Sequence, residues 1–311
     1  MKVLIAGATG AIGRPLVQHL RANQHEVFAL TRSPESASTP NAIGAEVILA
    51  DVLDGPAVKA ALGRIRPDAV INELTSLPRH YTRAEMKAAA ARDRRVRLEG
   101  NANLLASLRD AGVRRYLLQS AAFWYAPGVG LADETVPFIS TGSPAVEASV
   151  GTYQELEARA SAAAGIELVA LRYGFFYGPS TWYTREGDLV IRCGNDRFRL
   201  SVRARASTIS CISTMRPQRP LPHWRAPPGA YSIVDGNPSP QHVWLTAFAR
   251  AAGAPPPPRV SEEEALRTLG QDAVYYATKL RGASNDKARR EFDFRPRPLE
   301  WILVGTDEPT S

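Results

Sequence analysis

Cysteine and histidine are scarce in this sequence, and neither is spaced for a bridge or a metal site. The 311 residues include two cysteines, Cys193 and Cys211, which do not form a CxxC pair. The five histidines are scattered, without the short intervals at which metal ligands recur. We therefore expect neither a disulfide nor a structural metal ion.

Long apolar runs are missing as well. The early run at residues 3–6 is too short for the apolar segment of a signal peptide and is followed at once by glycine. No stretch approaches the roughly 20 residues that a membrane-spanning helix needs. These absences predict a cytoplasmic protein with no membrane partner.

Net positive charge is confined to one window of the chain. Residues 189–226 contain eight arginines and a single acid, Asp196, which accounts for the whole net charge of +7. Apart from Phe198 and Trp224, the window lacks the interleaved aromatic residues of a nucleic-acid surface, so we expect no nucleic-acid partner. It shows neither helical nor strand periodicity, and composition alone would make it a disordered basic insertion.

Over residues 1–177, short apolar runs alternate with helical patterns such as Ile12, Leu16 and Leu20. Continuous apolar runs are typical of parallel strands that helices cover on both faces. The pattern predicts an α/β fold: a doubly wound parallel Rossmann sheet in residues 1–178, and a smaller substrate-binding part in residues 179–311, irregular at 189–226. The predicted strands are residues 3–6, 27–30, 47–50, 69–72, 116–119 and 168–171.

Three glycines, Gly7, Gly10 and Gly13, follow the first predicted strand directly and open a helix. Glycine here permits a tight turn and a close approach of the backbone to a pyrophosphate. The N-terminus of the helix adds unpaired N–H groups and the positive end of a dipole. The loop therefore predicts an NAD(P)-binding site, in which the other expected contacts are Thr9, Ala11 and Ile12.

The GxxGxxG spacing of this loop resembles that of the short-chain dehydrogenase/reductase superfamily. Residues 51–54 (DVLD) and 171–179 (LRYGFFYGP) resemble motifs of its extended branch, the NAD-dependent epimerase/dehydratase type, and the closing segment 282–296 is similar too. The resemblance covers residues 1–188 and 228–302. It implies an NAD(P)-dependent oxidoreductase or epimerase that acts on a small carbonyl, hydroxyl or sugar-like substrate.

Cofactor contacts beyond the loop are expected from the same motifs. Asp51 and Val52 would lie at the adenine, whereas Asp54 could serve only as a helix cap before Pro56. Further expected contacts are Leu74, Tyr173 and Phe176, with core packing as the alternative for the aromatic residues.

Arg32 stands at the end of the second predicted strand, where an acid would normally bind the ribose 2′-hydroxyl of NAD. Its planar, permanently charged fork suits a 2′-phosphate, so the sequence favours NADP, with NAD as the alternative cofactor. The alternative for Arg32 is an ordinary solvated arginine.

The catalytic residues implied by the resemblance are Ser120, after the fifth predicted strand, and Tyr153. The family places a lysine four residues after the tyrosine, where it lowers the pKa of the phenol, but this chain has Glu157. A carboxylate there would raise that pKa, and no basic residue has the spacing to activate Tyr153. A lysine restored at position 157 would be expected to activate a Tyr153 acid.

Two functions are compatible with a glutamate at position 157. One is an active enzyme with a small-molecule substrate, and the other is a non-catalytic protein that binds NADP and reports it to a partner. For Tyr153, packing of the ring in an amphipathic helix is the alternative to catalysis. A homodimer and a monomer are both compatible with the sequence.

We predict that residues from about 189 to 226 are a frame-shifted reading of a normal family segment. If residues 211–217 are written as TGC ATC TCG ACG ATG CGG CC, reading from the third base gives His-Leu-Asp-Asp-Ala-Ala, which resembles the extended family at this point. The shift would also account for both cysteines and eight arginines in one window without periodicity. Sequencing the coding DNA tests the idea, which fails if neither alternative frame, free of stops, encodes this segment.

Overall fold

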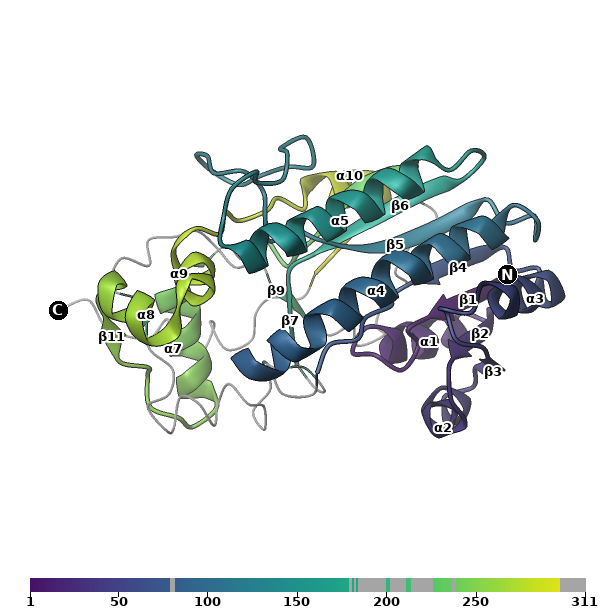
Figure 1. The fold of residues 1–311 in the computed structure, drawn as a ribbon, viewed down its shortest axis with the longest axis horizontal. Helices are drawn as coiled ribbons and strands as arrows, with labels where there is room; N and C mark the ends of the chain where they lie inside the picture. The colour runs from purple at the N-terminus through teal and green to yellow at the C-terminus, as the bar shows by residue number, and fades with distance from the viewer. Residues whose placement is uncertain are drawn as a thin grey trace.

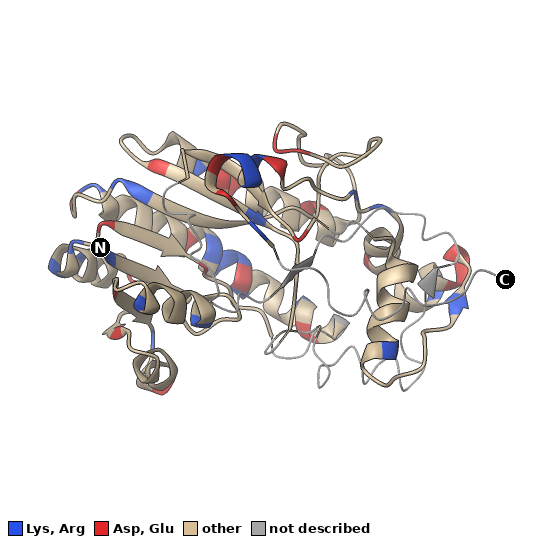
Figure 2. Cartoon of the chain, turned by 180° about the vertical axis from the view of Figure 1, so that it is seen from behind, with Lys and Arg blue, Asp and Glu red and all other residues tan. Residues whose placement is uncertain are grey.

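The computed structural model describes residues 1–78, 82–178, 181, 183, 200–201, 211–213, 226–236 and 239–296. Most of the window 189–226 lies outside these residues, and with it the predicted change of reading frame. Among the described residues, no helix is long and apolar enough to cross a bilayer. Basic and acidic residues are interspersed over the described helices (Figure 2).

Seven parallel strands form the central sheet, in the order β10-β6-β5-β4-β1-β2-β3. This confirms the doubly wound parallel sheet. The order reverses between β1 and β4, which makes their carboxyl ends the point where such sheets bind ligands. The strands are β1 (Lys2–Ala6), β2 (Glu26–Thr31), β3 (Glu46–Leu49), β4 (Ala69–Asn72), β5 (Arg115–Ala121), β6 (Glu167–Tyr173) and β10 (Gly229–Ile233).

Helices cover both faces of this sheet, because successive side chains of each strand point to opposite faces. In β1, Val3 and Ile5 pack in one apolar cluster with α1 and α10, whereas Leu4 and Ala6 pack in another with α3, α4 and α5. The layers are visible in Figure 1. The helices are α1 (Gly13–Ala22), α2 (Pro34–Ala42), α3 (Gly55–Ile65), α4 (Arg83–Leu108), α5 (Pro144–Ala162) and α10 (Asp286–Phe292).

Of the remaining elements, α7, α8, α9 and β11 lie at the other end of the molecule from β1, β2 and β3, and β7 and β9 lie nearer its middle (Figure 1). Trp244 and Phe248 of α7 pack in an aromatic cluster with Trp124, which follows β5, and with Val146 and Val150 of α5. This cluster joins the second part of the chain to the sheet domain. The helices outside the sheet domain are α7 (Gln241–Ala251), α8 (Glu262–Leu269) and α9 (Gln271–Thr278). The short strands are β7 (Phe175–Tyr177), β8 (Leu200–Ser201), β9 (Cys211–Ser213) and β11 (Arg259–Val260).

Candidate active site

Two glycines of the loop after β1 are required by the packing of the protein itself. Gly7 has a φ of +94°, and a Cβ on it would lie 2.4 Å from the carbonyl oxygen of Glu73. A Cβ on Gly13 would lie 2.2 Å from the carbonyl oxygen of Gly7. Neither position tolerates a side chain, so these glycines hold the loop tightly against the end of β4.

Gly10 is less crowded than Gly7 and Gly13. The residue is exposed, and the nearest atom to a Cβ built on it is the Gly7 carbonyl oxygen, at 3.3 Å. The N-terminus of α1 starts next to this residue, with no capping bond from a side chain and no acid in its first turn. An exposed glycine beside unpaired N–H groups and a positive helix end fits the pyrophosphate of a dinucleotide.

The residues expected at the adenosine half follow β2 and β3. Arg32 is exposed and makes no hydrogen bond or ion pair with the described part of the chain. Asp51 is exposed too, and its Oδ1 accepts a hydrogen bond from the Leu53 backbone N–H at 2.9 Å. Asp54 caps α3 by accepting from the Ala57 N–H at 3.0 Å, which confirms the helix-cap interpretation.

Other predicted cofactor contacts lie partly or wholly in the core. Val52 is buried, and its side chain faces α4, where a Cβ on Gly100 would lie 2.9 Å from it. Leu74 is half-buried and packs against the apolar cluster that contains Val52. Tyr173 is buried, with Phe176 half-buried beside it and the two ring centroids 5.3 Å apart.

Ser120 is buried, and its hydroxyl donates to Glu157 Oε1 at 2.5 Å. Glu157 in turn forms a bidentate ion pair with Arg172, whose Nε and Nη2 lie 2.9 and 2.7 Å from its two oxygens. Both charged side chains are largely buried, with 16 % and 12 % of Glu157 and Arg172 exposed. Glu157, which stands where the family has a lysine, therefore forms a structural ion pair.

Tyr153 has a basic neighbour after all, and it comes from another helix. The Arg97 guanidinium carbon lies 4.9 Å from the centre of the Tyr153 ring, and Trp124 packs 5.4 Å away. Burial raises the pKa of the Tyr153 phenol, and the positive charge of Arg97 opposes the shift without overcoming it. A cation therefore lies beside Tyr153 without activating it, and the pKa is raised by burial instead of by Glu157.

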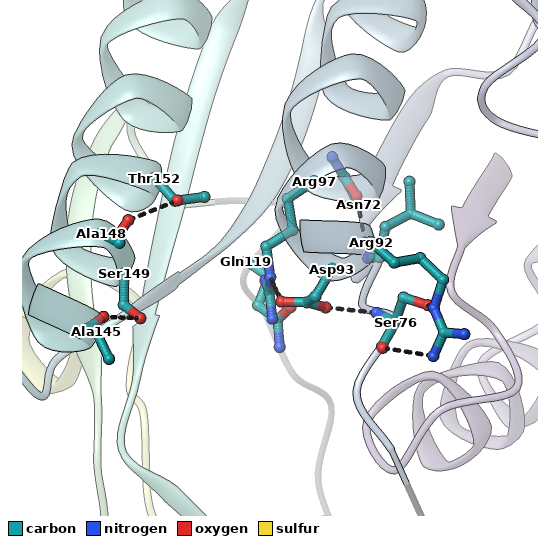
Figure 3. Close-up of polar contacts among 11 residues, drawn as sticks. Asn72, Ser76, Arg92, Asp93, Arg97, Gln119, Ala145, Ala148, Ser149 and Thr152 are labelled. Carbon is teal, nitrogen blue, oxygen red and sulfur yellow. Dashed lines mark hydrogen bonds and ion pairs between the residues drawn. The ribbon is translucent and has the colours of Figure 1, made fainter. Parts of the chain in front are cut away.

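Arg97 is held in place by a small polar network (Figure 3). Its Nε donates to Asp93 at 2.7 Å and its Nη1 to Gln119 at 3.2 Å. The other oxygen of Asp93 accepts from the Ser76 backbone N–H at 2.5 Å. The sequence analysis missed Arg97, although its spacing of four residues from Asp93 is that of an ion pair on one helix face.

Glu73, directly after β4, was missed as well. It is 5 % exposed, and its Oε1 accepts a hydrogen bond from the Tyr173 hydroxyl at 3.1 Å. Its Oε2 is buried and has no partner among the described residues. Burial raises the pKa of this carboxyl to about 8, against the opposing effects of Tyr173 and Arg97. A charged residue type at the end of a buried strand was the signal that could have identified it.

Comparisons with known proteins identify a family and similar folds. The model of the NAD dependent epimerase/dehydratase family matches residues 3–223. A 3-diazoavenalumate denitrifying reductase from Streptomyces sp is 36 % identical over 97 % of this chain and 98 % of its own. A nucleoside-diphosphate-sugar epimerase from Pseudomonas aeruginosa has a similar structure, with a TM-score of 0.74 and 20 % identity over 99 % of this chain and 96 % of its own.

A UDP-glucose 4-epimerase from Thermus thermophilus, solved with NAD, has a TM-score of 0.62 and 23 % identity over 89 % of this chain and 97 % of its own. Taken with the family match, these similarities confirm the extended Rossmann fold and the nicotinamide dinucleotide cofactor that the glycine loop predicts.

The ion pair under Ser120 predicts a large loss of stability in Glu157→Ala. The variant leaves Arg172 buried without its counter-charge, which should lower the free energy of unfolding by about 3–5 kcal/mol in denaturant titrations. Glu99→Ala, which removes an exposed pair with Arg95, is the matched control and should lose no more than about 1 kcal/mol. Glu157→Lys should be unstable too and gain no activity, because its ammonium would face Arg172. Wild-type stability in Glu157→Ala would contradict the assignment.

The raised pKa of Glu73 predicts a pH-dependent contribution to stability. Between about pH 5 and the folded pKa of about 8, the folded state binds more protons at Glu73 than the unfolded state does. The free energy of unfolding therefore falls as pH rises, by up to about 1.4 kcal/mol per pH unit from this group. Urea titrations of wild type and Glu73→Gln at pH 5, 6, 7 and 8 should show a difference that grows in favour of the variant. A difference that stays constant with pH would exclude a protonated Glu73.

Proposed function

Because the chain belongs to the NAD-dependent epimerase/dehydratase family of extended short-chain dehydrogenases/reductases, we propose that it is a reductase that uses NADPH to deliver hydride to an electrophilic aromatic compound. The substrate class that we propose is an aryl diazo compound, reduced with loss of dinitrogen. The observation that carries the proposal is that the pKa of Tyr153 is raised and that Glu157, in place of the family lysine, pairs with Arg172.

Epimerisation through a ketone and reduction of a ketone both need a side chain that takes or gives a proton. In this site the pKa of Tyr153 is raised, and the position of the family lysine is filled by a carboxylate that pairs with Arg172. A phenol with a raised pKa is a weaker acid, so it gives up its proton less readily near neutral pH. The residues therefore favour a reaction whose chemical step requires no proton transfer.

Reduction of an aryl diazonium group is such a reaction. When bound, a reduced nicotinamide supplies a hydride. At the ring carbon a C–H bond forms with the electron pair of the hydride, and the C–N bond breaks with its pair leaving on dinitrogen. Atoms and charge balance without a proton from the protein. The Streptomyces relative, 36 % identical over nearly the full chain, is named for a denitrifying reduction of a diazo compound.

The surroundings of Tyr153 supply aromatic surface for such a substrate. Phe123 and Phe175 are half-buried and stacked, with their ring centroids 4.2 Å apart, and Phe123 also packs edge-on against Trp124. Aromatic rings stack favourably on partly exposed rings of this kind. Sugar substrates, in contrast, require several side chains with free hydrogen-bonding groups, whereas Ser120 and Glu157 bond to each other.

An anaerobic assay of NADPH oxidation with 3-diazoavenalumate and simpler aryl diazonium salts tests the proposal. Dinitrogen and the arene should form in equal amounts, and deuterium from 4-deuterated NADPH should appear at the carbon that carried nitrogen. A nucleoside-diphosphate-sugar panel is the control and should show no turnover. Turnover of a sugar nucleotide but of no diazo compound would overturn the proposal. Tight dinucleotide binding without any hydride transfer would instead favour the non-catalytic sensor that Glu157 suggests.

We expect NADPH to bind more tightly than NADH, because the exposed fork of Arg32 forms charge-assisted hydrogen bonds with the 2′-phosphate. A preference of about 1.5–3 kcal/mol in calorimetric titrations is expected. Arg32→Ala should abolish it, whereas Arg64→Ala, at an exposed arginine in the last turn of α3, should leave it unchanged. Equal affinities of the unmodified protein for the two cofactors would refute this role of Arg32.

Gly10→Val should abolish dinucleotide binding while the secondary structure stays intact. Gly10 is exposed and a Cβ on it would contact only the Gly7 carbonyl oxygen, at 3.3 Å, so the valine would mainly occupy the space that the pyrophosphate needs. Gly63→Val in α3 is the matched control, since a Cβ there meets nothing within 4 Å. Fluorescence titration with NADPH and circular dichroism measure the two properties. Retained binding in Gly10→Val would mean that the loop is only a turn.

A further inference from the structure

Glu73 and Arg32 follow strands on opposite sides of β1. Arg32 and Asp51 follow β2 and β3, whereas Glu73 follows β4 and Tyr173 ends β6, on the other side of β1. A dinucleotide whose pyrophosphate lies on the glycine loop and whose adenosine lies over β2 and β3 extends its nicotinamide half toward β4 and β6. The carboxyl of Glu73 thus belongs to the nicotinamide half.

The charged and titratable groups around Glu73 come from three elements. Tyr173 of β6 donates to its Oε1, Arg97 of α4 acts on it electrostatically, and Tyr153 of α5 lies in the same cluster. The charge of Arg97 is already matched by Asp93, 2.7 Å away. Glu73 therefore lacks a dedicated cation, and the shift of its pKa to about 8 leaves it protonated at neutral pH.

The two oxygens of the Glu73 carboxyl differ in their surroundings. Oε1 accepts a hydrogen bond from the Tyr173 hydroxyl, whereas the buried Oε2 has no partner among the described residues. A buried polar atom without a partner is costly, and a fold rarely retains one without a role for it. A dinucleotide bound at the carboxyl end of β4 would change the surroundings of this atom.

We propose that Glu73 responds to the redox state of the dinucleotide: it releases its proton when the oxidised, cationic form binds and keeps it when the reduced form binds. The inference rests on dinucleotide binding and not on the diazo substrate. A positive nicotinamide ring stabilises a nearby carboxylate, whereas a neutral dihydronicotinamide does not. By linkage, ionisation of Glu73 strengthens binding of the oxidised form to the same extent.

Proton release measured by calorimetry tests this directly. Titrations with NADP+ and NADPH at pH 7, in two buffers of different ionisation enthalpy, should show nearly one more proton released with NADP+ than with NADPH. The 2′-phosphate is common to both ligands and cancels in the difference. Glu73→Gln should abolish the difference, whereas Glu46→Gln, at an exposed carboxylate at the opposite end of the sheet, should retain it.

A second measurement needs no variant and decides the matter if Glu73→Gln does not fold. In wild type, the ratio of the Kd for NADP+ to the Kd for NADPH should fall by up to tenfold per pH unit from pH 6 to 8 and level off above pH 8. A ratio independent of pH, or equal proton release with the two ligands, would overturn the role of Glu73 alone. Failure of both dinucleotides to bind would overturn the cofactor site with it.

Discussion

The chain can leave β1 and enter the glycine loop only because Gly7 has no side chain. A Cβ there would lie 2.4 Å from the carbonyl oxygen of Glu73, and the backbone has a φ of +94° that other residues rarely adopt. This close approach joins the carboxyl ends of β1 and β4 at the point where the strand order reverses. Gly13 then packs against the Gly7 carbonyl oxygen, and this contact fixes the start of α1 beside the same point. The place where α1 begins and the position of Glu73 both depend on this approach.

The buried carboxylates near these strand ends differ in whether they pair with a cation. Arg172 and Glu157 form one pair, and Arg97 and Asp93 form another, so each cation has its own carboxylate. Such pairs add little net stability compared with apolar residues of the same size, but removal of one partner is costly. They therefore fix the positions of Ser120 and Tyr153. Glu73 has no such partner among the described residues, and burial raises its pKa.

The elements built from local patterns were predictable from the sequence. Apolar runs between helical patterns located six of the seven strands of the sheet, and the glycine spacing located the loop that the structure places at the reversal of strand order. Asp54 was recognisable as a helix cap because capping depends on residues three apart. The seventh strand, β10, follows the irregular window. The apolar run that forms it was visible in the sequence.

The site chemistry was less accessible because it depends on contacts between distant segments. Arg97 of α4 reaches Tyr153 of α5, and the whole of β5 lies between these two helices in the sequence, so no spacing rule connects them. Ser120 is different, since its orientation follows from the period of two along β5. Tyr116 and Leu118 face the helices α4 and α5, so Ser120 does too, and it meets Glu157 of α5 there.

The exchange of lysine for glutamate at position 157 has a consistent physical explanation. A lysine there would place an ammonium beside Arg172, and two buried cations without a counter-charge would repel each other. The glutamate pairs with Arg172 and accepts a hydrogen bond from Ser120. The site then lacks the lysine cation that would lower the pKa of a phenol. Arg97 does not restore that function, because its charge is shared with Asp93 and the pKa of Tyr153 remains raised. This arrangement supports the proposal that hydride transfer alone completes the reaction at the substrate.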